Sequence, residues 1–209
     1  NHNPTKEPEV VLALKRMHRK IGRAQEQATP LIKTLLNKLL DNCDNSVMGI
    51  RNQVLLRLGY ETMRRRSELC AFRFTDISQA PNGKPVIRLN FSKTDQFGNG
   101  KIIPISEVLL TLLHKWKNIV GDSGYVLRSI RRHGDIGQHL SPSSVSVILK
   151  TLQATIHSDK NTPLLSGHSF RVGAALDLFE QGEPLEKIML RGGWQSDATA
   201  MKYLRSWIC

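Results

Sequence analysis

The most informative stretch of the chain reads Ser166-Gly167-His168-Ser169-Phe170-Arg171-Val172-Gly173-Ala174-Ala175. It places a histidine three residues before an arginine, a spacing that puts both on one face of a helix. Gly192-Gly193-Trp194 follows, and Tyr203 comes nine positions after the tryptophan. Each feature alone is ordinary, because helix faces, helix stops and surface tyrosines are common. Together they indicate a phosphate site.

Cleavage of a phosphodiester needs cationic donors on the non-bridging oxygens, a nucleophile in line and a proton donor for the departing oxygen. Arg171 suits the first task, because its planar guanidinium donates two parallel hydrogen bonds and stays charged. His168 can exchange protons near neutral pH, and the hydroxyl of Tyr203 can act as the nucleophile. A second arginine and a general acid are therefore expected elsewhere in the chain.

These residues resemble the second conserved box of the tyrosine recombinase (phage integrase) family and closely resemble that of its Cre-type members. The family's first catalytic arginine stands in a pattern Tyr-x-Thr-x-x-Arg-x-x-Glu, which residues 60–68 match as Tyr60-Glu61-Thr62-Met63-Arg64-Arg65-Arg66-Ser67-Glu68. A family lysine sits in the following β-hairpin, and Ser92-Lys93-Thr94 matches it. The resemblance extends over about residues 30 to 205.

The resemblance implies an enzyme that breaks and rejoins DNA strands through a covalent 3′-phosphotyrosyl link to Tyr203, without a metal or other cofactor. Arg65 and Arg171 would hold the scissile phosphate, and Lys93 would protonate the 5′-oxygen that leaves. His168 would handle the proton of Tyr203, and Trp194 would donate its indole N–H to the phosphate. Glu68 would orient Arg65 or His168.

Further arginines are expected to contact DNA rather than to take part in catalysis. On a helix, Arg64 and Arg66 would point about 100° to either side of Arg65, toward the DNA backbone or solvent. Arg128, Arg131 and Arg132 form a basic group without acidic neighbours and are also expected to bind DNA.

The composition favours a polyanionic partner. Thirty Lys and Arg residues against 18 Asp and Glu give a net charge of +12, so double-stranded DNA is the expected partner. Charge alone leaves open a ribosome-associated protein, a membrane-surface protein or a basic protein that is merely soluble. No membrane span, Walker loop or metal-ligand spacing is recognisable, and the three widely spaced cysteines favour a reduced compartment. A cytoplasmic, nucleoid-associated protein of bacterial or phage origin is therefore expected.

The apolar spacing predicts a mainly α-helical chain with a small antiparallel β-sheet, an α+β fold that corresponds to the catalytic-domain fold of tyrosine recombinases. Strands are expected at residues 86–91 and 101–105. Helices are expected from Pro30 to Leu40, Val47 to Tyr60, around Arg65 to Phe72, and over residues 107–120, 141–156, 169–181, 184–190 and 196–204.

Residues 1–29 are expected to be a linker or the tail of a missing N-terminal DNA-binding domain, and residues 30–209 the catalytic domain. By the same resemblance, the full-length protein would form a homotetramer on two DNA sites. Two alternatives share part of the pattern: a type IB topoisomerase that relaxes DNA, and a DNA-binding regulator without catalytic activity. The His-x-x-Arg order with Trp194 argues against the first, and retention of every catalytic position argues against the second.

Overall fold

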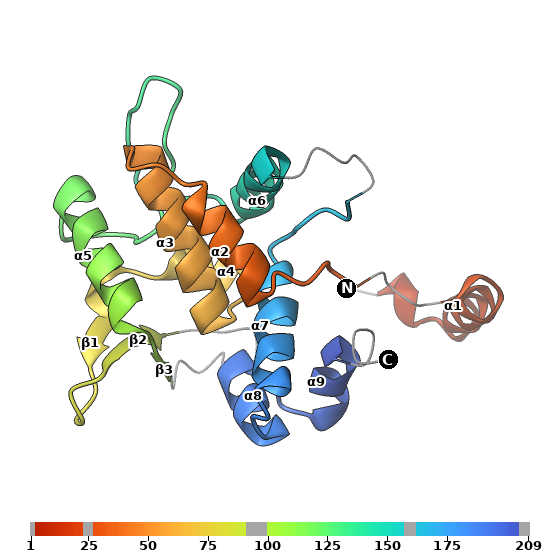
Figure 1. Ribbon diagram of the computed structural model, residues 1–209. Coiled ribbons are helices and arrows are strands. Elements are labelled where there is room, and N and C mark those ends of the chain that lie inside the picture. Colours follow the sequence, from red (N-terminus) through yellow and green to blue (C-terminus); the bar gives the residue numbers. More distant parts are fainter. Residues whose placement is uncertain (1–2, 23–26, 91–99, 157–161, 205–209) are drawn as a thin grey trace.

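The computed structural model describes residues 3–22, 27–90, 100–156 and 162–204. Helices predominate over one small sheet, as Figure 1 shows. The helices are α1 (Pro8–Ile21), α2 (Lys33–Asp41), α3 (Val47–Thr62), α4 (Arg66–Ala71), α5 (Glu107–Val120), α6 (Pro142–Ile156), α7 (Ser169–Glu180), α8 (Leu185–Gly192) and α9 (Asp197–Leu204), with short 3₁₀ turns at Pro4–Lys6 and Phe74–Asp76. The predicted fold class is confirmed.

The sheet has three antiparallel strands in the order β1 (Ile77–Gln79), β2 (Pro85–Leu89) and β3 (Lys101–Pro104). Ile87 in the central strand is paired with Ile77 on one side and Ile103 on the other. Both predicted strands are present. Strand β2 begins one residue earlier than predicted, at Pro85, and ends at Leu89, while the predicted end at Phe91 lies outside the described residues. Strand β3 ends at Pro104, one residue before the predicted end. The first strand was not predicted, because three residues are too few to show an alternating pattern.

Helix α2 begins at Lys33, so the prediction that Pro30 opens this helix was wrong. The amide of Leu31 instead donates to the carbonyl oxygen of Ser169 at 3.0 Å, which ties the segment to the start of α7. This crossing depends on Gly173, because a Cβ atom there would lie 2.0 Å from the carbonyl oxygen of Leu31. The amide of Lys33 then donates to the carboxylate of Asp177 at 2.7 Å, and the helix starts.

Two apolar clusters hold the fold together. The larger lies among α2 to α6 and the sheet, where Leu55 and Trp116 are fully buried. The smaller joins α7, α8 and α9 around Val172, Ile188 and Leu204, and it includes Met63 from the end of α3. The candidate site lies where the smaller cluster meets α3 and α4.

Helix α1 stands apart from the other helices in Figure 1. None of its residues is buried, and Val10, Leu14 and Met17 expose their side chains. Among the described residues, no helix is long and apolar enough to cross a membrane.

Candidate active site

The backbone between α3 and α4 determines where three consecutive arginines point. Met63 has φ 53° and ψ 32°, the left-handed conformation, and it ends α3. Helix α4 begins only at Arg66, so Arg64 and Arg65 lie in the connection. The expectation that Arg64 faces DNA or solvent from a helix was therefore wrong: its side chain is 2% exposed.

Arg65 and Glu68 form a local pair at the start of α4. Nη1 of Arg65 lies 2.9 Å from Oε1 of Glu68, and the backbone amide of Arg65 donates to Oε2 of the same carboxylate at 3.2 Å. Glu68 is 6% exposed, whereas about a third of the Arg65 side chain, 30%, remains exposed. The carboxylate therefore holds the arginine in place while part of the arginine side chain remains exposed.

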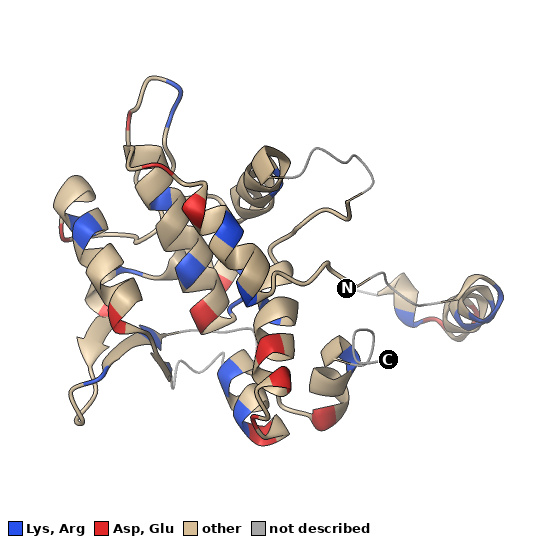
Figure 2. Ribbon diagram, viewed as in Figure 1, with Lys and Arg blue, Asp and Glu red and all other residues tan. Residues whose placement is uncertain are grey.

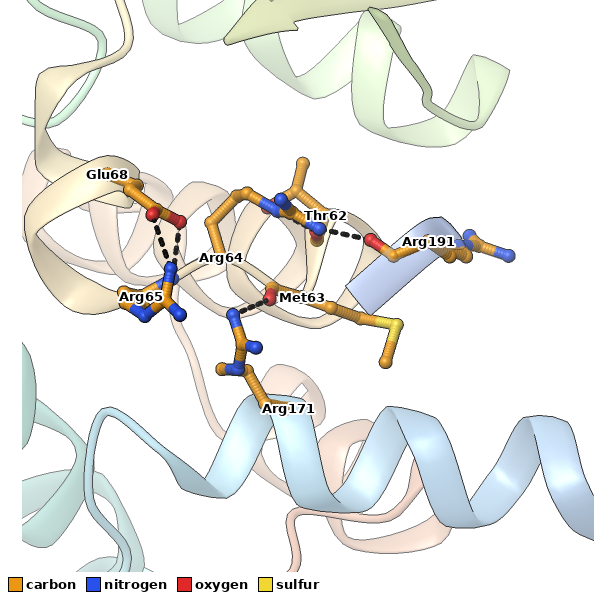
Figure 3. A network of polar contacts seen from close by, with 7 residues as sticks. All are labelled: Thr62, Met63, Arg64, Arg65, Glu68, Arg171 and Arg191. Carbon is orange, nitrogen blue, oxygen red and sulfur yellow. Dashed lines mark hydrogen bonds and ion pairs between the residues drawn. The ribbon is translucent and has the colours of Figure 1, made fainter. Parts of the chain in front are cut away.

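Arg171 approaches the same connection from α7. Its Nη1 donates to the carbonyl oxygen of Met63 at 3.1 Å, and the side chain is 1% exposed. Figure 3 shows Arg171 pointing from its helix toward Met63, with Arg65 nearby on the adjoining turn. Two guanidinium groups from distant parts of the sequence thus lie beside one stretch of backbone.

Trp194 packs against Arg171 at the end of α8. The helix ends at Gly193, whose φ of 71° favours glycine, and the amides of Gly193 and Trp194 both donate to the carbonyl oxygen of Met189. The guanidinium carbon of Arg171 lies 4.9 Å from the centroid of the Trp194 ring, within cation–π distance. The buried indole Nε1 of Trp194 has no hydrogen-bond partner within the described structure. A buried donor of this kind normally has an acceptor, so it suits an anionic ligand.

Tyr203 on α9 stacks beside the tryptophan. The two ring centroids are 5.2 Å apart and tilted by 40°. Tyr203 and His168 both line an open pocket of about 650 Å³, together with Lys202 and Ser166. The histidine and the phenol therefore line the same pocket, and the phenol ring packs against the Trp194 indole. Arg171 and Arg65 lie close enough to His168 to affect its pKa.

The electrostatics of this region are strongly positive. Burial lowers the pKa of Arg171, and the neighbouring charge of Arg65 lowers it further. Partial burial also lowers the pKa of His168, with additional contributions from Arg171, Arg66 and Arg65. His168 is therefore neutral near pH 7 and able to accept a proton. Perturbed groups that gather in one place are typical of functional sites.

The other predicted residues are distributed differently. Lys93 lies outside the described residues. Arg66 is exposed at the start of α4, and its side chain packs close to Gly167, next to His168. Arg131 and Arg132 are exposed in the connection between α5 and α6, which lies at the opposite end of the view from α8 and α9 (Figures 1 and 2). Arg128 in the same connection donates to the carbonyl oxygens of Tyr125 and Ser123.

Two cations near the site are missed by sequence reasoning, which assigns Arg64 to the surface and Lys101 only to a strand. The ammonium group of Lys101 donates to the carbonyl oxygen of Leu190 near the end of α8, and burial together with Arg64 lowers its pKa. The sequence pattern does not show that Arg64 or Lys101 lies near the site. The position of each side chain depends on a contact with α8, which is more than 85 positions away in the chain.

The residues that could ligate a metal do not gather in the described part of the chain. Within residues 3–22, 27–90, 100–156 and 162–204, no group of three or more His, Cys, Asp or Glu side chains is arranged to hold an ion. The acidic residues from 177 to 186 lie on α7, on α8 and in the turn between them (Figure 2).

Residues 31–207 match the model of the phage integrase family. Recombinase Cre of Escherichia phage P1 is 27% identical over 222 residues, a match that covers 97% of this chain and 64% of the relative. An integrase/recombinase XerD homolog of Selenomonas ruminantium is 29% identical over 212 residues, covering 97% of this chain and 61% of the relative. The chain thus spans less than two thirds of the length of either curated relative.

Solved structures agree with this fold. The XerA recombinase superposes with a TM-score of 0.64 at 15% identity, covering 97% of this chain and 71% of that one. Lambda integrase (residues 75–356) bound to DNA gives 0.64 at 20% identity, with 93% and 71% covered. The family model matches most of the chain, and the fold agrees with it. The chain therefore belongs to the phage integrase family, the tyrosine recombinases.

Proposed function

We propose that this chain is the catalytic domain of a site-specific DNA recombinase that cleaves and rejoins DNA strands through a 3′-phosphotyrosyl bond to Tyr203. The observation that carries the proposal is the set of contacts that gathers these side chains. Arg65 from the α3–α4 connection, Arg171 from α7, Trp194 from the turn after α8 and Tyr203 from α9 lie near one another, with His168 on the pocket that Tyr203 also lines. Within the described residues the buried indole N–H of Trp194 has no partner.

In the cleavage step, the phenol oxygen of Tyr203 attacks the phosphorus, and the bond from phosphorus to the 5′-oxygen breaks. The phenol proton passes to His168, whose lowered pKa keeps the imidazole available as the acceptor. The 5′-oxygen takes a proton, which we assign to Lys93 on the resemblance alone. Attack by a 5′-hydroxyl on the phosphotyrosyl bond reverses these transfers and rejoins the strand.

Arg65, Arg171 and Trp194 stabilise the phosphate as negative charge builds up on its oxygens. Permanently charged guanidinium groups donate two hydrogen bonds each with little rearrangement, and their effect grows where water is excluded. Arg171 is held by Met63 and by the tryptophan ring before any ligand arrives. Glu68 does the same for Arg65.

Double-stranded DNA is the proposed substrate. The net charge of +12 and the exposed Arg66, Arg131 and Arg132 support it, since neutralised phosphates dominate affinity for DNA. Assembly as a homotetramer on two DNA sites is proposed for the full-length protein. It is supported by a likeness in fold to a lambda integrase tetramer bound to a Holliday junction, with a TM-score of 0.62 at 19% identity.

Covalent capture on duplexes of random sequence tests the proposal and identifies the target at the same time. The chain is incubated with a pool of nicked random duplexes, and DNA that stays attached after denaturation is recovered and sequenced. We expect adducts enriched in one sequence, with the DNA mapped by peptide mass spectrometry to Tyr203. The variant Tyr203→Phe should bind the recovered duplex but form no adduct. An adduct that survives in this variant would remove Tyr203 from its role.

The same protein and DNA distinguish the proposed recombinase from a topoisomerase and from a DNA-binding regulator. A type IB topoisomerase would relax supercoiled plasmids that lack the recovered sequence, whereas the proposed recombinase would not. A silent DNA-binding regulator would bind DNA and yield no adduct from any duplex in the pool.

A further inference from the structure

The side chain of Arg64 joins two segments that carry the proposed catalytic residues. Its Nε donates to the carbonyl oxygen of Thr62 at 2.7 Å, and its Nη2 donates to the carbonyl oxygen of Arg191. Figure 3 shows the guanidinium reaching from the α3–α4 connection to the last turn of α8. One end of this link immediately precedes Arg65, and the other lies three residues before Trp194.

The fit at the α8 end is close. A Cβ atom on Gly193 would lie 2.8 Å from Nη1 of Arg64, so the guanidinium packs directly against the backbone that leads into Trp194. Because Trp194 in turn contacts Arg171, the position of Arg64 affects both sides of the proposed phosphate site.

The charge around Arg64 is poorly balanced. Burial lowers its pKa to about 10, and Arg171 and Arg65 act in the same direction. Glu68 opposes them, but its carboxylate is already bonded to Arg65. Within the described residues, no carboxylate forms an ion pair with Arg64. Three guanidinium groups thus share one carboxylate.

A residue needed only to tie two carbonyl oxygens together would not have to be charged. Burying a cation beside other cations is unfavourable unless a counter-charge arrives. An anion bound at Arg65 and Arg171 would supply that counter-charge, and the gain would be greatest when the phosphate carries the most negative charge, in the transition state.

We propose, on the basis of the function proposed above, that Arg64 is a positioning residue for strand cleavage. It holds the Trp194 turn against the α3–α4 connection and adds a buried positive charge behind the scissile phosphate, without touching the DNA. Its removal should therefore slow the chemical step more than it weakens DNA binding.

The test uses the duplex recovered by covalent capture, carrying a sulfur in place of the bridging 5′-oxygen so that cleavage is trapped. Single-turnover adduct formation is measured for the wild-type chain, Arg64→Met and Arg64→Lys. DNA affinity is measured for each in a Tyr203→Phe background, and thermal unfolding reports the fold. Arg51→Met is the matched control, because Arg51 is also buried, at 5% exposed, but lies near the other end of α3.

Arg64→Met should form the adduct about 50-fold more slowly, the order of magnitude for one charge acting through an effective dielectric constant of about 20. Its DNA affinity should change by less than about threefold, since no phosphate contact is removed. Arg64→Lys should react faster than Arg64→Met because it keeps the charge. Arg51→Met should react at the wild-type rate.

The measurements distinguish a failure of the proposed function from a failure of the role proposed for Arg64. If the wild-type chain forms no adduct at Tyr203, the proposed function itself fails. If the wild-type chain reacts and Arg64→Met matches its rate, the function stands and the role of Arg64 is refuted. A slow Arg64→Met variant with an equal loss of DNA affinity, or with Arg64→Lys no faster, would likewise overturn the role.

Discussion

Two buried arginines near opposite ends of α3 have different surroundings. Arg51 donates to Oδ1 of Asn52 at 2.9 Å and to the carbonyl oxygen of Arg128 at 3.4 Å. Burial lowers its pKa, and the neighbouring group that opposes this shift is the Cys43 thiol. Arg64 also donates to carbonyl oxygens, but the neighbours that shift its pKa include two further arginines.

The difference shows how a structural arginine can be told from one that belongs to an anion site. A single buried guanidinium with uncharged partners ties segments together, as Arg51 ties α3 to the connection before α6. Several guanidinium groups that share one carboxylate leave a positive charge uncompensated, which a bound phosphate would neutralise. By this criterion the region around Arg64, Arg65 and Arg171 has the charge balance of an anion site, and the region around Arg51 does not.

Replacing Arg171 should produce the largest contrast between the two regions. Arg171→Met is expected to lower the rate of adduct formation by about 1000-fold, because it removes a donor to the charge that develops in the transition state. Arg51→Met should stay within about threefold of the wild type, since that region makes no contact with the phosphate. Single-turnover rates on the recovered duplex measure both. If both variants lost the same fraction of the wild-type rate, the losses would be due to impaired folding and not to a missing contact with the phosphate.

Inorganic phosphate should reveal the same contrast without DNA. At a concentration ten times its dissociation constant, a ligand of the folded state stabilises it by about 1.4 kcal/mol, or about 4 °C in a chain of this size. The wild-type chain and Arg51→Met should both show this rise in melting temperature. Arg65→Met should lose it. Thermal unfolding with and without phosphate provides the measurement, and a rise that persists in Arg65→Met would place the anion elsewhere.

The smallest expected effect concerns the protonation of His168. In the free protein its pKa should lie below the ordinary histidine value of about 6.5, because burial and cations disfavour the charged imidazole. Arg66→Met removes one of these cations and should move the pKa upward. Adduct formation should then fall off with decreasing pH from a higher pH than in the wild type, since proton acceptance needs the neutral ring.

NMR titration of the imidazole signals follows this change directly. A titration midpoint above 6.5 in the wild-type chain, or a downward move in Arg66→Met, would contradict the electrostatic account of the site.

Much of the candidate site could be predicted because the proposed chemistry restricts residue type and order. Arg65, His168, Arg171, Trp194 and Tyr203 could be named from the sequence, and they lie close together in the structure. The position of Trp194 follows from a helix stop that the sequence marks clearly, Gly193 at the end of α8. Lys93 remains a prediction that rests on the resemblance.

The burial of Arg64 could not be predicted because it depends on one backbone conformation. A methionine in the left-handed region is uncommon, and nothing in the pattern around Met63 signals it. Placed on a helix beside Arg65, Arg64 was expected to point toward DNA or solvent. In the connection that follows Met63, its side chain instead points inward and reaches α8. The start of α2 was misplaced for a similar reason, since the pairing of Leu31 with Ser169 is a contact between distant segments.

A crystal structure of the chain with orthovanadate tests the central claim most directly, because five-coordinate vanadate imitates the transition state of transfer at phosphorus. We predict vanadium bonded to the phenol oxygen of Tyr203, with its equatorial oxygens accepting hydrogen bonds from Arg65, Arg171 and Nε1 of Trp194. Vanadate bound away from Tyr203, with the two guanidinium groups unengaged, would contradict the account.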